Sequence, residues 1–313
     1  MKDLPPADAL LHEGRAPWNG PALAVVGVLG FSFKAILIKL AYAWTPIDAL
    51  TLLTLRMIYS APFFALMAWW ATRQRAALPI GRRDWMLLGW LGFVGYYVAS
   101  LFDFIGLEYI TASLERLILF LYPTLVVLLS AAFFRQGIGG RTLAALTLSY
   151  AGILLVFLND PSVTGVPRAA WLGGGLVFAS ALCYALYLVG CGPVIARLGS
   201  LRFIAWAMLI SSAFVFAQFL ATRRLAALAA PLSIHLLSLA MALFSTVLPT
   251  LFIAEAIKSI GADRTSMIGS LGPVFTIALG YWILGEPVHA VQLGGVVLVL
   301  AGVTLVTVRP KAA

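Results

Sequence analysis

Residues 20–43 read GPALAVVGVLGFSFKAILIKLAYA, an apolar run of 24 residues whose only charges are two lysines. The hydrocarbon core of a bilayer is about 30 Å thick, and a helix of about 20 apolar residues crosses it. This run is therefore long enough to span a membrane, and similar runs follow it between short polar breaks. The sequence predicts ten spans, at residues 20–43, 47–72, 84–106, 110–134, 141–158, 170–192, 202–221, 232–257, 263–284 and 289–308.

The overall composition agrees with a chain that lies mostly in lipid. Of its 313 residues, 62% are hydrophobic and 11% are charged, whereas about 25% of the residues of a soluble domain are charged. We therefore predict an all-α polytopic membrane protein, because helices satisfy their own backbone hydrogen bonds in hydrocarbon. The sequence contains no Gly-Lys-Ser/Thr phosphate loop, so any transport is expected to be secondary or passive.

The net charge of +9 comes from basic residues that gather in the breaks between the predicted spans. This distribution favours the positive-inside rule over nucleic-acid binding. It predicts a bacterial inner-membrane protein with two cytoplasmic tails, at residues 1–19 and 309–313. The first tail shows no small-residue cleavage pattern, so no removable signal peptide is expected.

The chain contains a weak internal repeat. A shift of 150 positions aligns residues 71–156 with 221–306 without a gap, and 21 of the 86 aligned positions are identical. We predict two repeats of five spans each, at residues 20–158 and 170–308. Because five is odd, the second repeat starts on the opposite side of the membrane, and inverted repeats of this kind are typical of alternating-access transporters.

Short motifs in the second repeat resemble the EamA-like branch of the drug/metabolite transporter superfamily. They are Gly272-Pro273-Val274-Phe275, Leu284-Gly285-Glu286-Pro287, Gln292-Leu293-Gly294-Gly295 and Ala301-Gly302-Val303, with Leu55-Arg56 in the second span. The first repeat departs from the pattern, since Phe134-Arg135-Gln136-Gly137 replaces Gly-Glu-Pro. The resemblance implies a ten-helix fold, a central cavity lined by helices 1, 3, 4, 6, 8 and 9, and rocking of the two halves.

Lys34 is the first candidate for substrate binding. It lies fourteen residues into the first span, on the face that carries Gly27, Phe31 and Ile38. A charge near the centre of a bilayer costs about 2.5 to 3.5 kcal/mol, so such a group predicts function. Two interpretations remain open: Lys34 and its neighbour Phe31 contact substrate, or Lys34 pairs with an acid of helix 3 or helix 4.

The sixth span carries a polar stripe that ends at Cys191. Ser180, Tyr184 and Tyr187 precede it at helical spacing, and we expect this stripe to face the stripe of Lys34. Tyrosines offer a substrate both a ring face and a hydroxyl. The alternative is that these tyrosines only pack between helices.

Spans 3 and 4 add further candidates for the site. Tyr96, Ser100 and Asp103 share one stripe of span 3, and Glu115 is followed directly by Arg116 in span 4. Asp103 lies near the outer end of its span and is either solvated there or, with Glu115, involved in proton coupling. The guanidinium of Arg116 suits a carboxylate or a phosphate. We expect Glu115 to share a helix face with Tyr122, seven residues later.

Other residues are predicted to act on the backbone or on packing. Pro123 and Pro273 are equivalent in the repeat, and each removes a helical hydrogen bond, so they either bend the two gates or form static kinks. Arg56 is expected to form a structural ion pair, and Glu286 is expected to cap a helix at a tight turn.

Several chemistries are not expected. His12, His235 and His289 lie in the tail or near span ends, and Cys183 and Cys191 share one span without further ligands. We therefore predict no metal, no cofactor and no catalytic residues.

The favoured function is an exporter or exchanger of small charged or zwitterionic metabolites, most of all amino acids. The alternatives are an organophosphate or nucleotide-sugar exchanger and, from another class, an intramembrane enzyme acting on lipid. The expected partners are a small-molecule substrate and the lipid bilayer but not nucleic acid, and a homodimer stays an open alternative.

Overall fold

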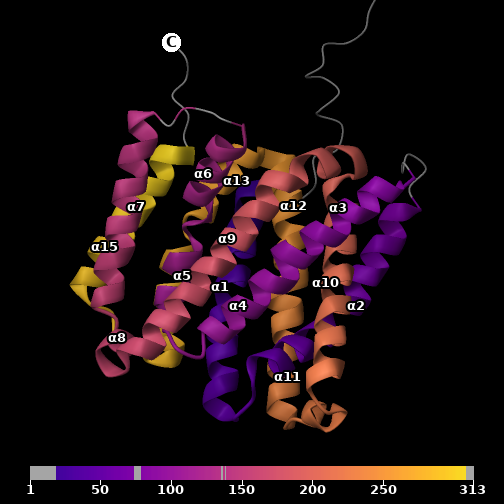
Figure 1. Ribbon diagram of the computed structural model, residues 1–313, viewed down its shortest axis with the longest axis horizontal. Coiled ribbons are helices and arrows are strands. Elements are labelled where there is room, and N and C mark those ends of the chain that lie inside the picture. The colour runs from indigo at the N-terminus through magenta and orange to yellow at the C-terminus, as the bar shows by residue number, and fades with distance from the viewer. Residues whose placement is uncertain (1–18, 74–78, 135–136, 138, 308–313) are drawn as a thin grey trace, which may run out of the picture.

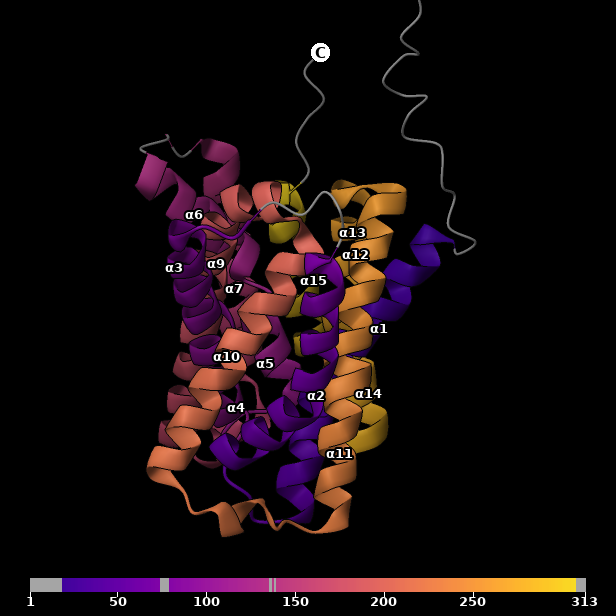
Figure 2. The same cartoon turned by 90° about the vertical axis from the view of Figure 1, so that its right-hand side faces the viewer.

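The computed structural model describes residues 19–73, 79–134, 137 and 139–307, and these residues form helices without any strand. Most long helices stand side by side, while those of residues 82–106 and 167–198 run obliquely across their neighbours (Figures 1 and 2). Among the described residues, nine helices are long and apolar enough to cross a membrane, and Ala290–Leu305 forms a shorter tenth. The prediction of an all-α polytopic bundle is confirmed.

The first half contains α1 (Gly20–Trp44), α2 (Ala49–Thr72), α3 (Arg82–Gly92), α4 (Ala99–Gly106), α5 (Ala112–Leu119), α6 (Tyr122–Phe134) and α7 (Gly140–Leu158). The short α8 (Pro161–Gly165) leads into the second half, which contains α9 (Pro167–Leu198), α10 (Ser200–Thr222), α11 (Leu232–Ala242), α12 (Leu248–Ile260), α13 (Ala262–Gly269), α14 (Gly272–Leu279) and α15 (Ala290–Thr307).

Three crossings contain short π-helical segments, and two are interrupted by a turn. Phe93–Val98 joins α3 to α4, Leu243–Val247 joins α11 to α12, and Gly280–Leu284 follows α14. The first two segments lie 150 residues apart, as do the turns that separate α5 from α6 and α13 from α14. The structure therefore repeats its irregularities at the period of the sequence.

Proline explains only part of this pattern. Pro249 lies in the first turn of α12, just after a π-helical segment, and Pro273 lies in the first turn of α14. Pro273 follows a turn, so its missing N–H falls where a helix start has no backbone acceptor. Pro249 lies in a helix that continues from the π-helical segment, so it removes one backbone hydrogen bond there. The equivalent of Pro249 in the first repeat is Ala99, and the π-helix forms there as well.

Helix α9 differs from its predicted span. It contains 32 residues and continues through Pro193, where the prediction ended at residue 192. An interior proline can kink a helix without ending it. The span is thus extended by six residues at this end.

Helices α7 and α15 pack along each other at one edge of the bundle (Figure 1). Their backbones meet at glycines: a Cβ atom added to Gly302 would lie 2.6 Å from the carbonyl oxygen of Ala145, and one added to Gly152 would lie 2.6 Å from that of Gly295. Small residues let the two backbones come this close. In lipid, where no hydrophobic driving force acts between helices, the resulting van der Waals packing stabilises the helix pair.

Gly302→Val is expected to destabilise the protein by about 1 to 3 kcal/mol, because the side chain would push α15 away from backbone atoms that cannot yield. Gly294→Val is the matched control, since Gly294 lies on the same helix with nothing within 4 Å of an added Cβ. Thermal unfolding in detergent measures both. Equal melting temperatures for the two variants would show that the close contact carries no stability.

Candidate functional site

An ion triad lies inside the bundle where α1, α4 and α5 meet. The ammonium of Lys34 lies 2.6 Å from Oδ2 of Asp103 and 3.5 Å from Oε1 of Glu115. The side chain of Lys34 is 19% exposed, whereas those of Asp103 and Glu115 are 2% and 0% exposed. Lys34 therefore pairs with acids of both predicted helices, 3 and 4.

The burial of Asp103 corrects one of the sequence-based interpretations. Asp103 lies near the end of α4, as predicted, but it is not solvated there, because Lys34 of α1 and Glu115 of α5 cover it. Asp103 is therefore part of a buried charge cluster with Lys34 and Glu115, and not an isolated surface charge.

The triad is incompletely satisfied. Oδ1 of Asp103 and both carboxylate oxygens of Glu115 are buried and accept no hydrogen bond from a donor group of the described residues, and the two carboxyl groups lie close enough to share a proton. Two carboxylates and one ammonium carry a net charge of −1 when all three are ionised, and the nearby guanidinium groups of Arg56 and Arg116 offset this charge. Buried polar groups usually have partners, so these oxygens indicate a place for a proton or for a cationic group of a ligand.

Arg116, the neighbour of Glu115 in α5, makes a different set of contacts. Its guanidinium lies beside Gly272, where an added Cβ would be 2.8 Å from Nη2. In the described part of the chain it makes no hydrogen bond and no ion pair within 4 Å, and its Nε is buried. Arg116 therefore lies at the point where α14 begins without a hydrogen bond or close ion pair in the described residues, while its charge acts on Glu115, Tyr122 and Tyr184.

Arg56 corrects a second prediction. Its side chain is buried, but in the described residues no carboxylate lies within 4 Å of it. Instead, Nη2 donates a hydrogen bond of 3.2 Å to Oγ of Ser100, and the guanidinium lies over the ring of Phe104 at 4.9 Å. The hydroxyl of Ser100, a predicted substrate ligand, is thus engaged by a structural arginine.

Tyrosines form the other wall of the site. The hydroxyls of Tyr96 and Tyr187 lie 3.0 Å apart, and the ring of Tyr184 packs on those of Tyr187 and Tyr122. Arg116 interacts electrostatically with Tyr122 and Tyr184 as well as with Glu115 of the triad. The tyrosines of α9 contact Tyr96 of the third span, Tyr122 of the fourth span and Phe203 of α10. Among the ring contacts of the described residues, the half-buried Phe31 has no part, so the predicted facing of this stripe with that of Lys34 is not seen there.

The predicted shared face of Glu115 and Tyr122 is wrong. Helix α5 ends at Leu119 and α6 begins at Tyr122, so the helical spacing does not continue across the turn between them. Pro123 lies just after this turn, beside a cavity of about 90 Å³ that also borders Ser270 and Thr304. Pro123 and Pro273 thus follow equivalent helix breaks, while their role in gating stays a prediction.

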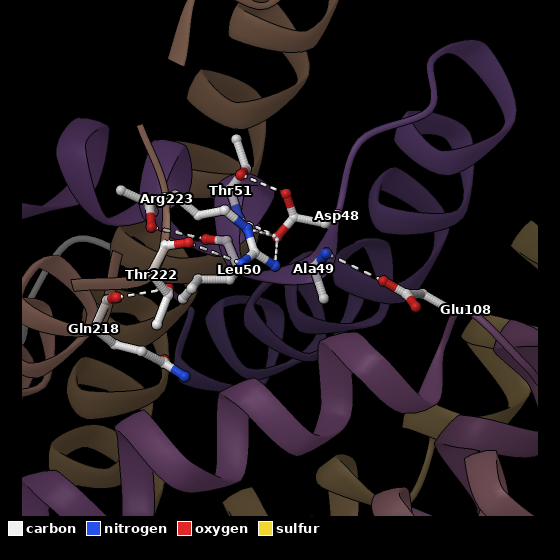
Figure 3. Close-up of polar contacts among 9 residues, drawn as sticks. Asp48, Ala49, Leu50, Thr51, Glu108, Gln218, Thr222 and Arg223 are labelled. Atoms are coloured by element: carbon white, nitrogen blue, oxygen red, sulfur yellow. Dashed lines mark hydrogen bonds and ion pairs between the residues drawn. The ribbon is translucent and has the colours of Figure 1, made fainter. Parts of the chain in front are cut away.

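Polar contacts also close one end of the bundle, formed by residues 45–48, 107–111, 159–166, 223–231 and 285–289, which we call the Glu286 end. Figure 3 shows two of these contacts: Nη2 of Arg223 lies 3.2 Å from Oδ1 of Asp48, and the N–H of Ala49 donates to Glu108. Near them, the ammonium of Lys39 donates to two backbone carbonyls, those of Leu107 and Ile110.

The acids at this end differ in their titration. Burial raises the pKa of Asp48, but hydrogen bonds from Thr51 and Arg223 lower it by more, so the pKa lies below its usual value. The pKa of Glu108 lies above its usual value, because burial and the nearby charge of Asp48 raise it by more than the hydrogen bond from Ala49 lowers it. Asp48 therefore stays ionised, and keeps its ion pair, to lower pH than an ordinary aspartate.

Buried charges from several helices, inside a bundle built from two repeats, define a polytopic membrane protein of the transporter type. The EamA-like transporter family matches residues 18–158 and 171–308. The chain therefore belongs to this family, and the resemblance noted in its sequence is confirmed.

Named relatives are also transporters. The chain is 29% identical over 293 residues to the uncharacterized transporter YcbK of Bacillus subtilis, covering 90% of this chain and 92% of that protein. It is 29% identical over 216 residues to the uncharacterized transporter YyaM of the same organism, covering 68% and 70%. A solved crystal structure with 18% identity has a TM-score of 0.61 and covers 91% of this chain and 95% of its own, which supports the fold.

Proposed function

We propose that this EamA-family transporter carries small zwitterionic metabolites, with amino acids as its substrates, by alternating access. One observation carries this proposal: in the described residues the guanidinium of Arg116 makes no hydrogen bond or ion pair within 4 Å, and it interacts with the carboxyl group of Glu115, whose buried oxygens accept no hydrogen bond from a donor group. A carboxylate matches the guanidinium, and an ammonium group matches that carboxyl group.

The position of Lys34 supports this substrate class over organophosphates. A phosphate dianion would favour several converging cations, but the ammonium of Lys34 faces two acids and Arg56 is held by Ser100 and Phe104. Arg116 alone suits a single carboxylate. The tyrosines Tyr96, Tyr184 and Tyr187 then supply ring faces and hydroxyls for the remainder of the substrate.

A proton is the coupling ion in this proposal. When substrate is absent, a proton on Asp103 or Glu115 neutralises the surplus charge of the triad, and the substrate ammonium replaces it. Substrate and proton then move in opposite directions. Under the same proposal both termini lie in the cytoplasm of a bacterial inner membrane, and Pro123 and Pro273 bend the two gates.

Uptake into proteoliposomes tests the proposal. Labelled amino acids, sugar phosphates and amines are compared at two opposite pH gradients, with protein-free liposomes as the control. We expect uptake of amino acids that changes with the direction of the pH gradient. Uptake of sugar phosphates without amino acids would overturn the substrate class, and amino-acid uptake that ignores the gradient would overturn proton coupling.

A further inference from the structure

Glu286 of the second repeat binds the start of α5 in the first repeat. Its Oε1 accepts a hydrogen bond of 2.7 Å from the N–H of Ala112, and its Oε2 accepts bonds from the N–H and the hydroxyl of Ser113 at 3.2 and 2.6 Å. The first N–H groups of a helix have no backbone acceptor, and the helix dipole favours a negative charge there. The predicted capping role of Glu286 is thus fulfilled across the repeats.

The surrounding residues fit this contact. Gly285 has a φ of +67°, a conformation that glycine adopts without strain, and it turns the chain so that Glu286 follows. A Cβ added to Gly280 would lie 2.9 Å from Oε2 of Glu286, so this glycine leaves room for the carboxylate. On the other side, Lys39 holds the backbone that leads into α5 through the carbonyls of Leu107 and Ile110.

The contact lies close to the proposed substrate site. Glu115 follows Ala112 by three residues, or about 4.5 Å along the helix axis. Because α5 ends after eight residues at a turn, its position depends on what holds its two ends. Any movement of its first turn therefore moves Glu115 and Arg116.

We infer that Glu286 is a latch between the two repeats, which closes the Glu286 end of the bundle and positions the charged residues of α5. The inference rests on the proposed alternating-access function. Opening of this end requires the three hydrogen bonds to break. In the sequence, the shift of 150 positions aligns a neutral glutamine, Gln136, with Glu286, so this carboxylate belongs to one repeat alone.

Glu286→Gln tests the latch with little change in shape. An amide keeps one acceptor oxygen but loses the charge and turns its NH₂ toward a donor of Ser113, so the contact should fail. In nanodiscs, hydrogen–deuterium exchange of residues 107–119 is expected to become about tenfold faster, because charge-assisted hydrogen bonds are the stronger class. Exchange of residues 257–270, at the opposite end, is expected to become slower, since the two ends open alternately.

The control is Asp48→Asn, which weakens another polar contact of the same end without touching α5. It should leave exchange of residues 112–119 unchanged, because its neighbourhood reaches Glu108 through Ala49 but does not reach α5. If Glu286→Gln does not fold, Ser113→Ala removes one of the three bonds and should give a smaller change of the same pattern. Unchanged exchange in residues 107–119, or equally faster exchange in all peptides, would overturn the latch. No substrate is needed, so the result is independent of the transport assay.

Discussion

Replacing Arg116 with glutamine is expected to raise the KM for a carboxylate-bearing substrate about 100-fold, since loss of one partner of a buried charge pair costs about 2 to 5 kcal/mol and 1.4 kcal/mol corresponds to tenfold. The loss should be confined to binding, because in the described part of the chain Arg116 has no hydrogen bond or ion pair to lose. Initial rates of proteoliposome uptake over a range of substrate concentrations measure it.

Arg224→Gln is the matched control for this variant. Arg224 is exposed at the Glu286 end of the bundle, so the same change of residue there should leave the KM as it is. The melting temperature of the Arg116 variant should stay near that of the wild type. An unchanged KM would exclude Arg116 as a substrate ligand, and a large loss of stability would make it a structural residue.

Lys34→Met is expected to have a different effect, a loss of stability of about 3 to 5 kcal/mol, because removing one partner of a buried ion pair leaves its charge uncompensated. Here two carboxylates, of Asp103 and Glu115, would lose the same cation. Thermal or denaturant unfolding in detergent measures the change. Transport should be lost as well, but as a consequence of the damaged triad.

A second substitution separates these two effects. Adding Asp103→Asn to Lys34→Met removes one of the stranded charges and should restore most of the stability without restoring proton-dependent transport. Lys258→Met serves as the control, since Lys258 forms an exposed pair with Glu255 that is worth less than about 1 kcal/mol. Equal stability of the Lys34 and Lys258 variants would contradict a structural triad.

Much of the fold was predictable because lipid imposes simple rules on a helix. Length and apolarity placed the ten crossings within a few residues, apart from the longer α9. The repeat period of 150 residues also made Pro123 and Pro273 equivalent, and in the structure both lie directly after equivalent helix breaks. The π-helical segments were not predicted, since Phe93–Val98 contains no proline and no break in apolarity to mark it.

The charged site was predictable in its members but only partly in its partners. Lys34 was selected because an ionisable group deep in a membrane span is costly unless it is paired or functional. The acids of helices 3 and 4 were its expected ion-pair partners. Which of these groups remains unpaired depends on distances between helices, which a sequence does not contain. Arg116 therefore became distinct from Arg56 only when Gly272 and Ser100 were seen beside them.

Contacts between the repeats were the least accessible to sequence analysis. Glu286 was expected to cap a helix near its own turn, but the helix that it caps begins 174 residues earlier in the chain. For Asp103, solvation at the end of its span was one of two interpretations that the sequence left open. In both cases the missing information was which helix covers the residue.

Recognition of a zwitterion by Arg116 and the triad is tested most directly by competition in a counterflow assay. A labelled amino acid that the proteoliposome panel identifies is challenged with its unlabelled form, its methyl ester and its N-acetyl derivative. We expect the unlabelled amino acid to compete and both derivatives to compete at least about tenfold less well, since each lacks one of the two charges. Equal competition by the ester would contradict binding of the carboxylate by Arg116, and equal competition by the N-acetyl derivative would contradict binding of the ammonium by the triad.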